Sequence, residues 1–141
     1  MTTIPGLQPI VIGLGCSSAA DAPEIIALVD ACLAEAGLDA TRIAAFATHV
    51  RKRESRALAQ AAFHFDVPLR FLDDDDLAYT GTAEPAASAA GTLILGKRKS
   101  HYATCAIALA APGFTPSHFG QPASPSAAIA SSTLATSLAG P

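Results

Sequence analysis

The sequence predicts an α/β fold in which a mixed, mostly parallel sheet lies in a three-layer α/β/α sandwich and ends in an antiparallel hairpin. Short apolar runs alternate with amphipathic segments over residues 7–72, the order that winds a parallel sheet. Only about seven residues separate the last two apolar runs, too few for a crossover helix. The chain has 141 residues, the length of one domain.

The first strand and helix have clear boundary signals. Residues 7–13 form a short apolar run rich in β-branched residues that ends in glycine, which predicts a buried strand. A helix should follow, with Ser18 or Asp21 as its cap and Pro23 in its first turn. Apolar residues recur at helical spacing until Gly37, where we expect this helix to stop.

The next three elements continue the alternation of strand and helix. Residues 43–48 predict a second strand, and residues 54–65 predict an amphipathic helix with one apolar face. Residues 67–72 predict a third strand, in which Pro68 is tolerated because it lies at the start. The acidic run at residues 73–76 is typical of the beginning of a helix, where negative charge is favourable.

Composition divides the chain into a domain at residues 1–111 and a tail rich in Pro, Ser and Ala at residues 112–141. The tail holds five prolines and no Asp, Glu, Lys or Arg. It lacks the apolar density for a second core, although a short helix near residues 127–138 could dock on the domain.

Length, charge and cysteine content exclude several classes of protein. No apolar run reaches the roughly 18 residues of a membrane span, and the start lacks a signal-peptide pattern, so we expect a soluble cytoplasmic protein with no membrane partner. A net charge of −3 argues against a nucleic-acid partner.

Cys16, Cys32 and Cys105 have no Cys-x-x-Cys spacing, which predicts reduced, buried thiols. The histidines have no metal-ligand spacing, and we expect neither a metal nor a cofactor.

Basic residues are concentrated in two places despite the negative total charge. Seven of the nine Lys and Arg residues form one cluster over residues 51–56 and another over residues 97–99. The first cluster follows the second predicted strand, at the edge where open α/β sheets place ligands. Two interpretations remain open for each cluster: a binding surface, or a solvated helix face and a hairpin tip protected by lysine.

The segment 13–18 also has more than one interpretation. The dinucleotide fingerprint is incomplete, since Ser18 stands where a third glycine is needed and no acidic residue ends the second strand. Gly13 and Gly15 could simply permit a tight turn. Alternatively, the N–H groups of Cys16, Ser17 and Ser18 could form a helix-start nest for a carboxylate. A nucleophilic role for Cys16 has less support than a buried thiol, because no motif ties a histidine to it.

Two end motifs resemble the CobE/CbiG C-terminal domain family of cobalamin biosynthesis. Family members open with an apolar strand and a Gly-x-Gly-Cys turn, as residues 10–16 do here. They close with a Leu-Ile-x-x-Lys-x-Lys-Ser turn and a Thr-x-Ala-x-Ala strand, as residues 93–100 and 104–108 do. Lys52 matches a lysine that commonly follows the second strand of the family.

The resemblance implies a cobalamin biosynthesis protein that binds a precorrin or cobalt-precorrin, a tetrapyrrole rimmed with carboxylates. Two alternatives remain: a non-catalytic module that docks on other corrin-pathway enzymes, and an activity like that of a cobalt-precorrin lactone hydrolase. No catalytic residue can be named for the latter. The residues that we expect to bind the ligand come from both end motifs and the first basic cluster: Gly13, Gly15, Cys16, Ser17, Ser18, Lys52, Lys97, Lys99, Ser100 and Thr104.

Overall fold

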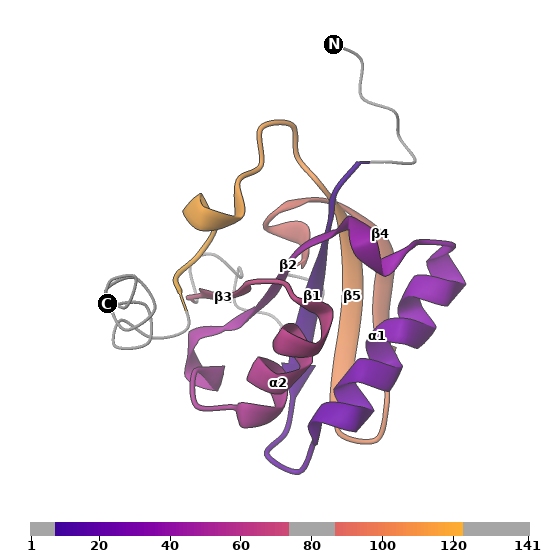
Figure 1. Ribbon diagram of the computed structural model, residues 1–141, viewed down its shortest axis with the longest axis vertical. Coiled ribbons are helices and arrows are strands. Elements are labelled where there is room, and N and C mark those ends of the chain that lie inside the picture. Colours follow the sequence, from indigo (N-terminus) through magenta and orange to yellow (C-terminus); the bar gives the residue numbers. More distant parts are fainter. Residues whose placement is uncertain (1–7, 74–86, 123–141) are drawn as a thin grey trace.

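A five-stranded mixed sheet forms the centre of the protein (Figure 1). The structure is a computed structural model that describes residues 8–73 and 87–122. The strands lie in the order β3-β2-β1-β5-β4. Their bounds are Ile10–Cys16 for β1, Ile43–His49 for β2, Leu69–Leu72 for β3, Gly91–Lys99 for β4 and Ala103–Ala110 for β5.

The directions of the strands confirm the predicted topology. β1, β2 and β3 are parallel neighbours, whereas β5 is antiparallel to both β1 and β4. β4 approaches β5 so closely at Gly91 that a Cβ there would lie 1.9 Å from the Leu109 carbonyl oxygen. Only glycine therefore fits at the start of the hairpin.

Two helices connect the parallel strands, with the boundary signals described above. In α1 (Ala22–Ala36), the Asp21 side chain accepts a hydrogen bond from the Glu24 amide at 2.9 Å. Gly37 ends α1 with a φ of 69°, as expected for a left-handed cap. The Ser55 hydroxyl caps α2 (Arg56–Phe65), which therefore starts two residues later than predicted. Short 3₁₀ turns, η2 (Ala40–Arg42) and η3 (Val50–Lys52), flank β2.

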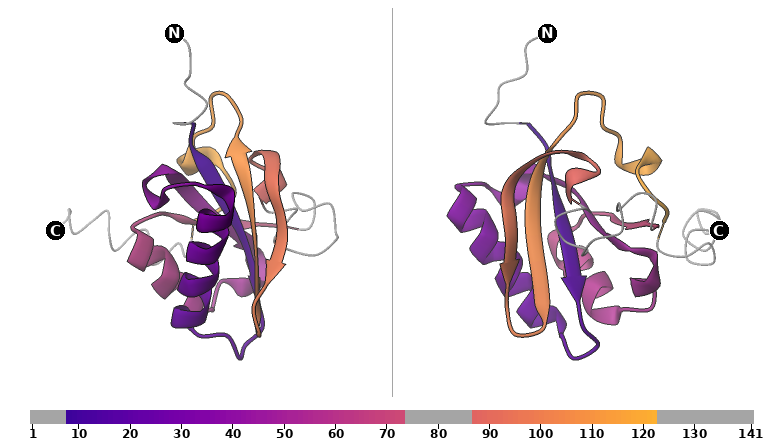
Figure 2. Two further views of the ribbon diagram at one scale, coloured as in Figure 1. Left: turned by 90° about the vertical axis from the view of Figure 1, so that its right-hand side faces the viewer. Right: turned by 180° about the vertical axis from the view of Figure 1, so that it is seen from behind.

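The two faces of the sheet differ in the size of their side chains. Large residues such as Ile12, Phe46 and Ile107 face α1 and α2, and these two helices lie on the same side of the sheet (Figure 2). The opposite face carries small residues, among them Ala47, Ala106 and Ala108. Residues 87–90 and 112–122 lie against this second face and supply its covering within the described residues.

The segment that follows β5 is partly packed on the sheet. Phe114 and Phe119 contact the apolar cluster of the second face, on either side of the 3₁₀ turn η4 (Pro116–His118). Gln121 pairs with Phe71 at the edge of β3. The first residues of the predicted tail thus pack on the domain, while the helices expected after residue 73 and near residues 127–138 fall outside the described residues.

Within the described residues, the structure has no helix long and apolar enough to cross a membrane.

Candidate functional site: a basic groove at one end of the sheet

Two loops and a hairpin meet at the end of the sheet where β1 and β2 finish. Their side chains surround a surface pocket of about 390 Å³, called here the hairpin pocket. The loops after β1 and β2 and the turn between β4 and β5 supply its lining: Gly15, Cys16, Ser17, Arg51, Lys52, Lys97, Lys99, Ser100, His101, Tyr102, Ala103 and Thr104.

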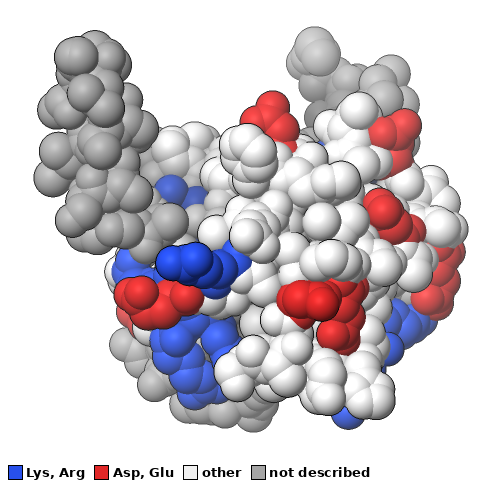
Figure 3. Space-filling model, turned by 60° about the horizontal axis from the view of Figure 1, so that its bottom comes forward, with Lys and Arg blue, Asp and Glu red and all other residues white. Residues whose placement is uncertain are grey.

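The lining of the hairpin pocket is strongly basic. Arg51 and Lys52 come from η3, and Lys97 and Lys99 come from β4, so the two basic clusters of the sequence meet here. Among the described residues that line the pocket, none is Asp or Glu. Figure 3 views the molecule toward this end, where Lys and Arg side chains gather on one side with acidic side chains beside them. These four cations favour an anionic ligand even though the chain is acidic, and the Glu24 carboxylate lies beside the pocket, bonded to Ser100 and Tyr102.

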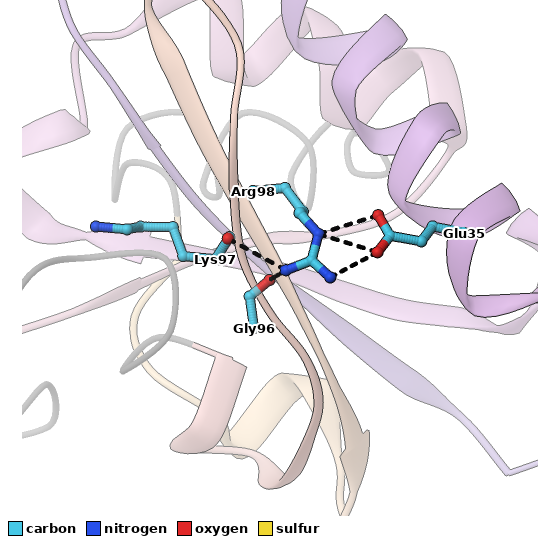
Figure 4. Close-up of polar contacts among 4 residues, drawn as sticks. All are labelled: Glu35, Gly96, Lys97 and Arg98. Carbon is cyan, nitrogen blue, oxygen red and sulfur yellow. Dashed lines mark hydrogen bonds and ion pairs between the residues drawn. The ribbon is translucent and has the colours of Figure 1, made fainter.

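The β4 strand separates its basic side chains between its two faces. Arg98 reaches toward α1, where its Nη2 lies 2.5 Å from Glu35 Oε2, and Lys97 extends in the other direction (Figure 4). Lys99 pairs with Thr104 in the hairpin. The Arg98 hydrogen bonds lower the pKa of Glu35. Lys97 and Lys99 therefore line the pocket, whereas Arg98 serves a structural contact.

Glu24 fixes the hairpin turn to α1, a role that the sequence analysis missed. Its Oε2 accepts a hydrogen bond from the Tyr102 amide at 2.6 Å and another from the Ser100 hydroxyl. The Ser17 amide donates to the Tyr102 carbonyl at 2.9 Å. The only hint in the sequence is an acidic residue in the first turn of α1, which is common for reasons of helix stability alone.

The predicted helix-start nest is wrong. β1 does not end at Gly13 but continues to Cys16, because β5 pairs with it as far as Ala103. α1 then begins only at Ala22, and the Ser17 amide is already bonded to the hairpin turn. Gly13 is buried in the middle of β1 and lines neither pocket of this end.

A second pocket of about 390 Å³, called here the α2 pocket, adjoins the first. Cys16, Ser17, Arg51 and Lys52 line both pockets. The remaining lining of the α2 pocket comes from the β1–α1 loop and the start of α2: Ser18, Ala20, Glu54, Ser55, Arg56 and Ala57. The two pockets form one groove across the end of the sheet.

Cys16 lies where the two pockets meet. Its side chain is partly exposed, and its Sγ is 4.0 Å from the Ser55 Oγ. The prediction of a buried thiol is wrong for this residue, because the pairing that extends β1 carries Cys16 to the rim of the groove. The prediction is confirmed for Cys32 and Cys105, which are 1% and 0% exposed. The hydrogen bond that the Cys105 thiol donates to Cys32, together with burial, raises the pKa of Cys105.

A local contact positions Arg51, whereas Arg53 lies outside the groove. His49 Nδ1 accepts a hydrogen bond from the Arg51 amide at 3.0 Å and so caps η3. The Arg53 guanidinium donates to the Pro122 carbonyl at 2.9 Å and lies 5.2 Å from the centre of the Phe71 ring. The first basic cluster thus contributes to the groove and to the packing of residues 121–122.

The fold and its groove define a small mixed α/β domain with a basic site at the end of its sheet. Comparisons with known proteins give the family. The profile of the family described as "Cobalamin synthesis G C-terminus" matches residues 10–81. Protein CobE of Sinorhizobium sp is 34% identical over 121 residues, covering 70% of this chain and 79% of that protein. The chain therefore belongs to the Cobalamin synthesis G C-terminus family of cobalamin biosynthesis proteins.

Solved structures agree with this assignment. The crystal structure of CobE, a protein from the cobalamin (vitamin B12) biosynthetic pathway, matches with a TM-score of 0.70 at 25% identity. That match covers 79% of this chain and 95% of the CobE chain. Cobalamin biosynthesis protein chiG from Agrobacterium tumefaciens matches with a TM-score of 0.61 at 26% identity, covering 72% of this chain and 98% of that one.

Proposed function

We propose that this cobalamin biosynthesis protein binds a precorrin or cobalt-precorrin intermediate in the basic groove, in the cytoplasm. The observation that carries the proposal is the meeting of Arg51, Lys52, Lys97 and Lys99 around one pocket. Family membership supports the choice of ligand, because intermediates of cobalamin biosynthesis are tetrapyrroles with acetate and propionate groups around their rim.

The groove has the chemical character that such a ligand requires. Lys and Arg side chains bind carboxylates through charge-assisted hydrogen bonds, which are stronger than neutral ones. Tyr102, which is 44% exposed, lines the same pocket. Its ring offers an apolar surface to the body of the macrocycle.

The proposal is tested by absorbance titration of the protein with precorrin intermediates. Lys52→Ala and Lys97→Ala should each weaken binding by about 1 kcal/mol, the upper end of the range for exposed ion pairs, because both side chains are solvent-accessible. Added salt should weaken binding as well, since part of the attraction is screened. Arg98→Ala is the matched control: it removes the same charge from the same strand but on the face toward α1.

Two results would count against this function. If the parent protein gives no spectral response to any precorrin, while Lys52→Ala and Lys97→Ala disrupt a complex with a corrin-pathway enzyme, the groove is a docking surface. If Arg98→Ala weakens precorrin binding as much as Lys97→Ala does, the ligand does not lie in the groove. Mass spectrometry of the titrated samples would reveal turnover, including lactone opening.

A further inference from the structure

We propose that the α2 pocket is a second anion-binding subsite, so that one ligand lies across the end of the sheet with carboxylates in both pockets. This inference rests on the proposed function and deepens it. It assigns a binding role to Arg56, and it limits the ligand to wide anions that carry charge on opposite edges.

The two pockets open on opposite sides of the sheet. The hairpin pocket includes Thr104, the partner of Lys99, on the face of β5 that points away from the helices. The α2 pocket includes Ala20 and Ala57, which pack against the core cluster on the helix side. Cys16, Ser17, Arg51 and Lys52 lie between them and line both. A ligand that fills both pockets must therefore cross the ends of β1 and β2.

The α2 pocket has its own cation. Arg56 lines only this pocket, beside the shared Arg51 and Lys52. The Ser55 hydroxyl accepts a hydrogen bond from the Leu58 amide as the helix cap and lies 4.0 Å from Cys16 Sγ, and its O–H can still donate to a ligand. The basic side chains supply the charge that would hold an anion here.

Glu54 and Arg56 carry opposite charges in the same pocket, so replacing each of them gives a separate test of anion binding there. Glu54 is the one acidic residue in the lining of either pocket within the described residues. A carboxylate bound beside Arg56 is attracted by that residue and repelled by Glu54. Removing the two charges should therefore change affinity with opposite signs, which a general loss of folding cannot imitate.

A rigid macrocycle with carboxylates around its whole rim is the class of ligand that fits this arrangement. Its width lets acidic groups on opposite edges reach the two pockets at once, and its planar body covers Cys16 and Ser17 between them. An anion that carries its charge on one edge can fill only one pocket.

The experiment is a calorimetric titration of the full chain with uroporphyrin, a stable polycarboxylate tetrapyrrole. We expect one uroporphyrin per chain. Arg56→Ala should weaken binding about three- to tenfold, and Glu54→Gln should tighten it about two- to fivefold. Arg98→Ala and Asp30→Asn are charge-matched controls outside both pockets and should change affinity less than about twofold, because salt screens solvent-exposed charges that do not contact the ligand.

The outcomes separate this inference from the proposed function. Binding that weakens in Lys97→Ala but does not respond to Arg56→Ala or Glu54→Gln overturns the second subsite and leaves the hairpin pocket as the site. Two uroporphyrins per chain would overturn the claim that one ligand spans both pockets. Absence of binding in the parent protein, with the octamethyl ester also inert, overturns the proposed function and this inference with it.

Discussion

Glu24 shapes the groove although it does not line either pocket. Its carboxylate accepts hydrogen bonds from the Tyr102 amide and the Ser100 hydroxyl, and both donors belong to the turn between β4 and β5. That turn leads from Lys99 into β5, so the carboxylate determines where one side of the hairpin pocket lies relative to α1. Because one partner is charged, these hydrogen bonds are worth more than neutral ones.

Glu24→Ala should loosen the hairpin turn. We expect the free energy of unfolding to fall by about 1–3 kcal/mol, the range for losing hydrogen bonds to a charged group. Hydrogen exchange at the Tyr102 amide should also become faster. Asp30→Ala is the matched control, since it removes an exposed acidic side chain from the same helix. Equal urea midpoints for the Glu24 variant and the parent would contradict this role.

Thr48 is a buried polar residue whose hydroxyl has no hydrogen-bond partner within the described part of the chain. An unsatisfied buried hydroxyl reduces stability, because its hydrogen bonds to water are lost on folding. Thr48→Val should therefore increase the free energy of unfolding by about 1 kcal/mol. Thr92→Val makes the same change on an exposed position of β4 and serves as the control. A lower urea midpoint for the Thr48 variant would disprove this expectation.

At the scale of elements, the Glu35–Arg98 pair connects the last turn of α1 to the β4 strand. Both side chains are roughly half exposed, and Arg98 Nε contacts both carboxylate oxygens of Glu35 at 3.0 and 3.1 Å. The hydrogen bonds from Arg98 lower the pKa of Glu35 below its ordinary value of 4.5. A lowered carboxyl pKa means that folding is favoured when Glu35 is ionised.

The pH dependence of stability should reveal this pair. Its contribution is complete above pH 4.5, the ordinary pKa, and is lost as the pH falls through the lower pKa of the folded state. Glu35→Gln should therefore reduce the loss of stability between neutral and acidic pH, as measured by thermal unfolding across that range. Asp30→Asn, on the exposed side of α1, is the control. Identical pH profiles for the Glu35 variant and the parent would rule out the effect.

Local residues determine most element boundaries, which explains why the sequence predicts them well. Asp21 and Gly37 delimit α1 through contacts within a few residues of the chain. The end of β1 is different, because its last residues are strand only through their pairing with β5. The partner of Arg98 is likewise 63 residues away along the chain. Such long-range contacts leave no periodic signal in the sequence.

At the scale of the whole molecule, topology accounts for the part of the site that was predicted. Lys52 follows a parallel strand next to β1, and parallel neighbours end at the same edge of a sheet. A short hairpin beside β1 then brings Lys97 and Lys99 to that same end. Strand alternation alone places Arg98 on the opposite face from Lys97 and Lys99. The register shift between Leu95 and Arg98, which the sequence does not display, turns Arg98 rather than the lysines toward α1.

Other parts of the site required the structure. Gly13 was predicted to bind the ligand because it begins a turn-like motif, but it lies inside β1. His101 and Tyr102 line the hairpin pocket through the path of the hairpin turn, for which the sequence has no specific signal. The location of Cys16 at the junction of both pockets follows from the extended β1 strand and from the position of η3 beside it.

The central claim is that a carboxylate-rimmed tetrapyrrole binds in the groove. Its most direct test is to measure the rate of Cys16 alkylation with and without ligand. Cys16 is the one partly exposed cysteine among the three, since Cys32 and Cys105 are buried, so a thiol reagent reports on the groove. The account predicts that a precorrin slows modification of Cys16 in the folded protein, with less protection in Lys97→Ala. Unchanged alkylation of Cys16 at ligand concentrations that saturate the spectral response would contradict it.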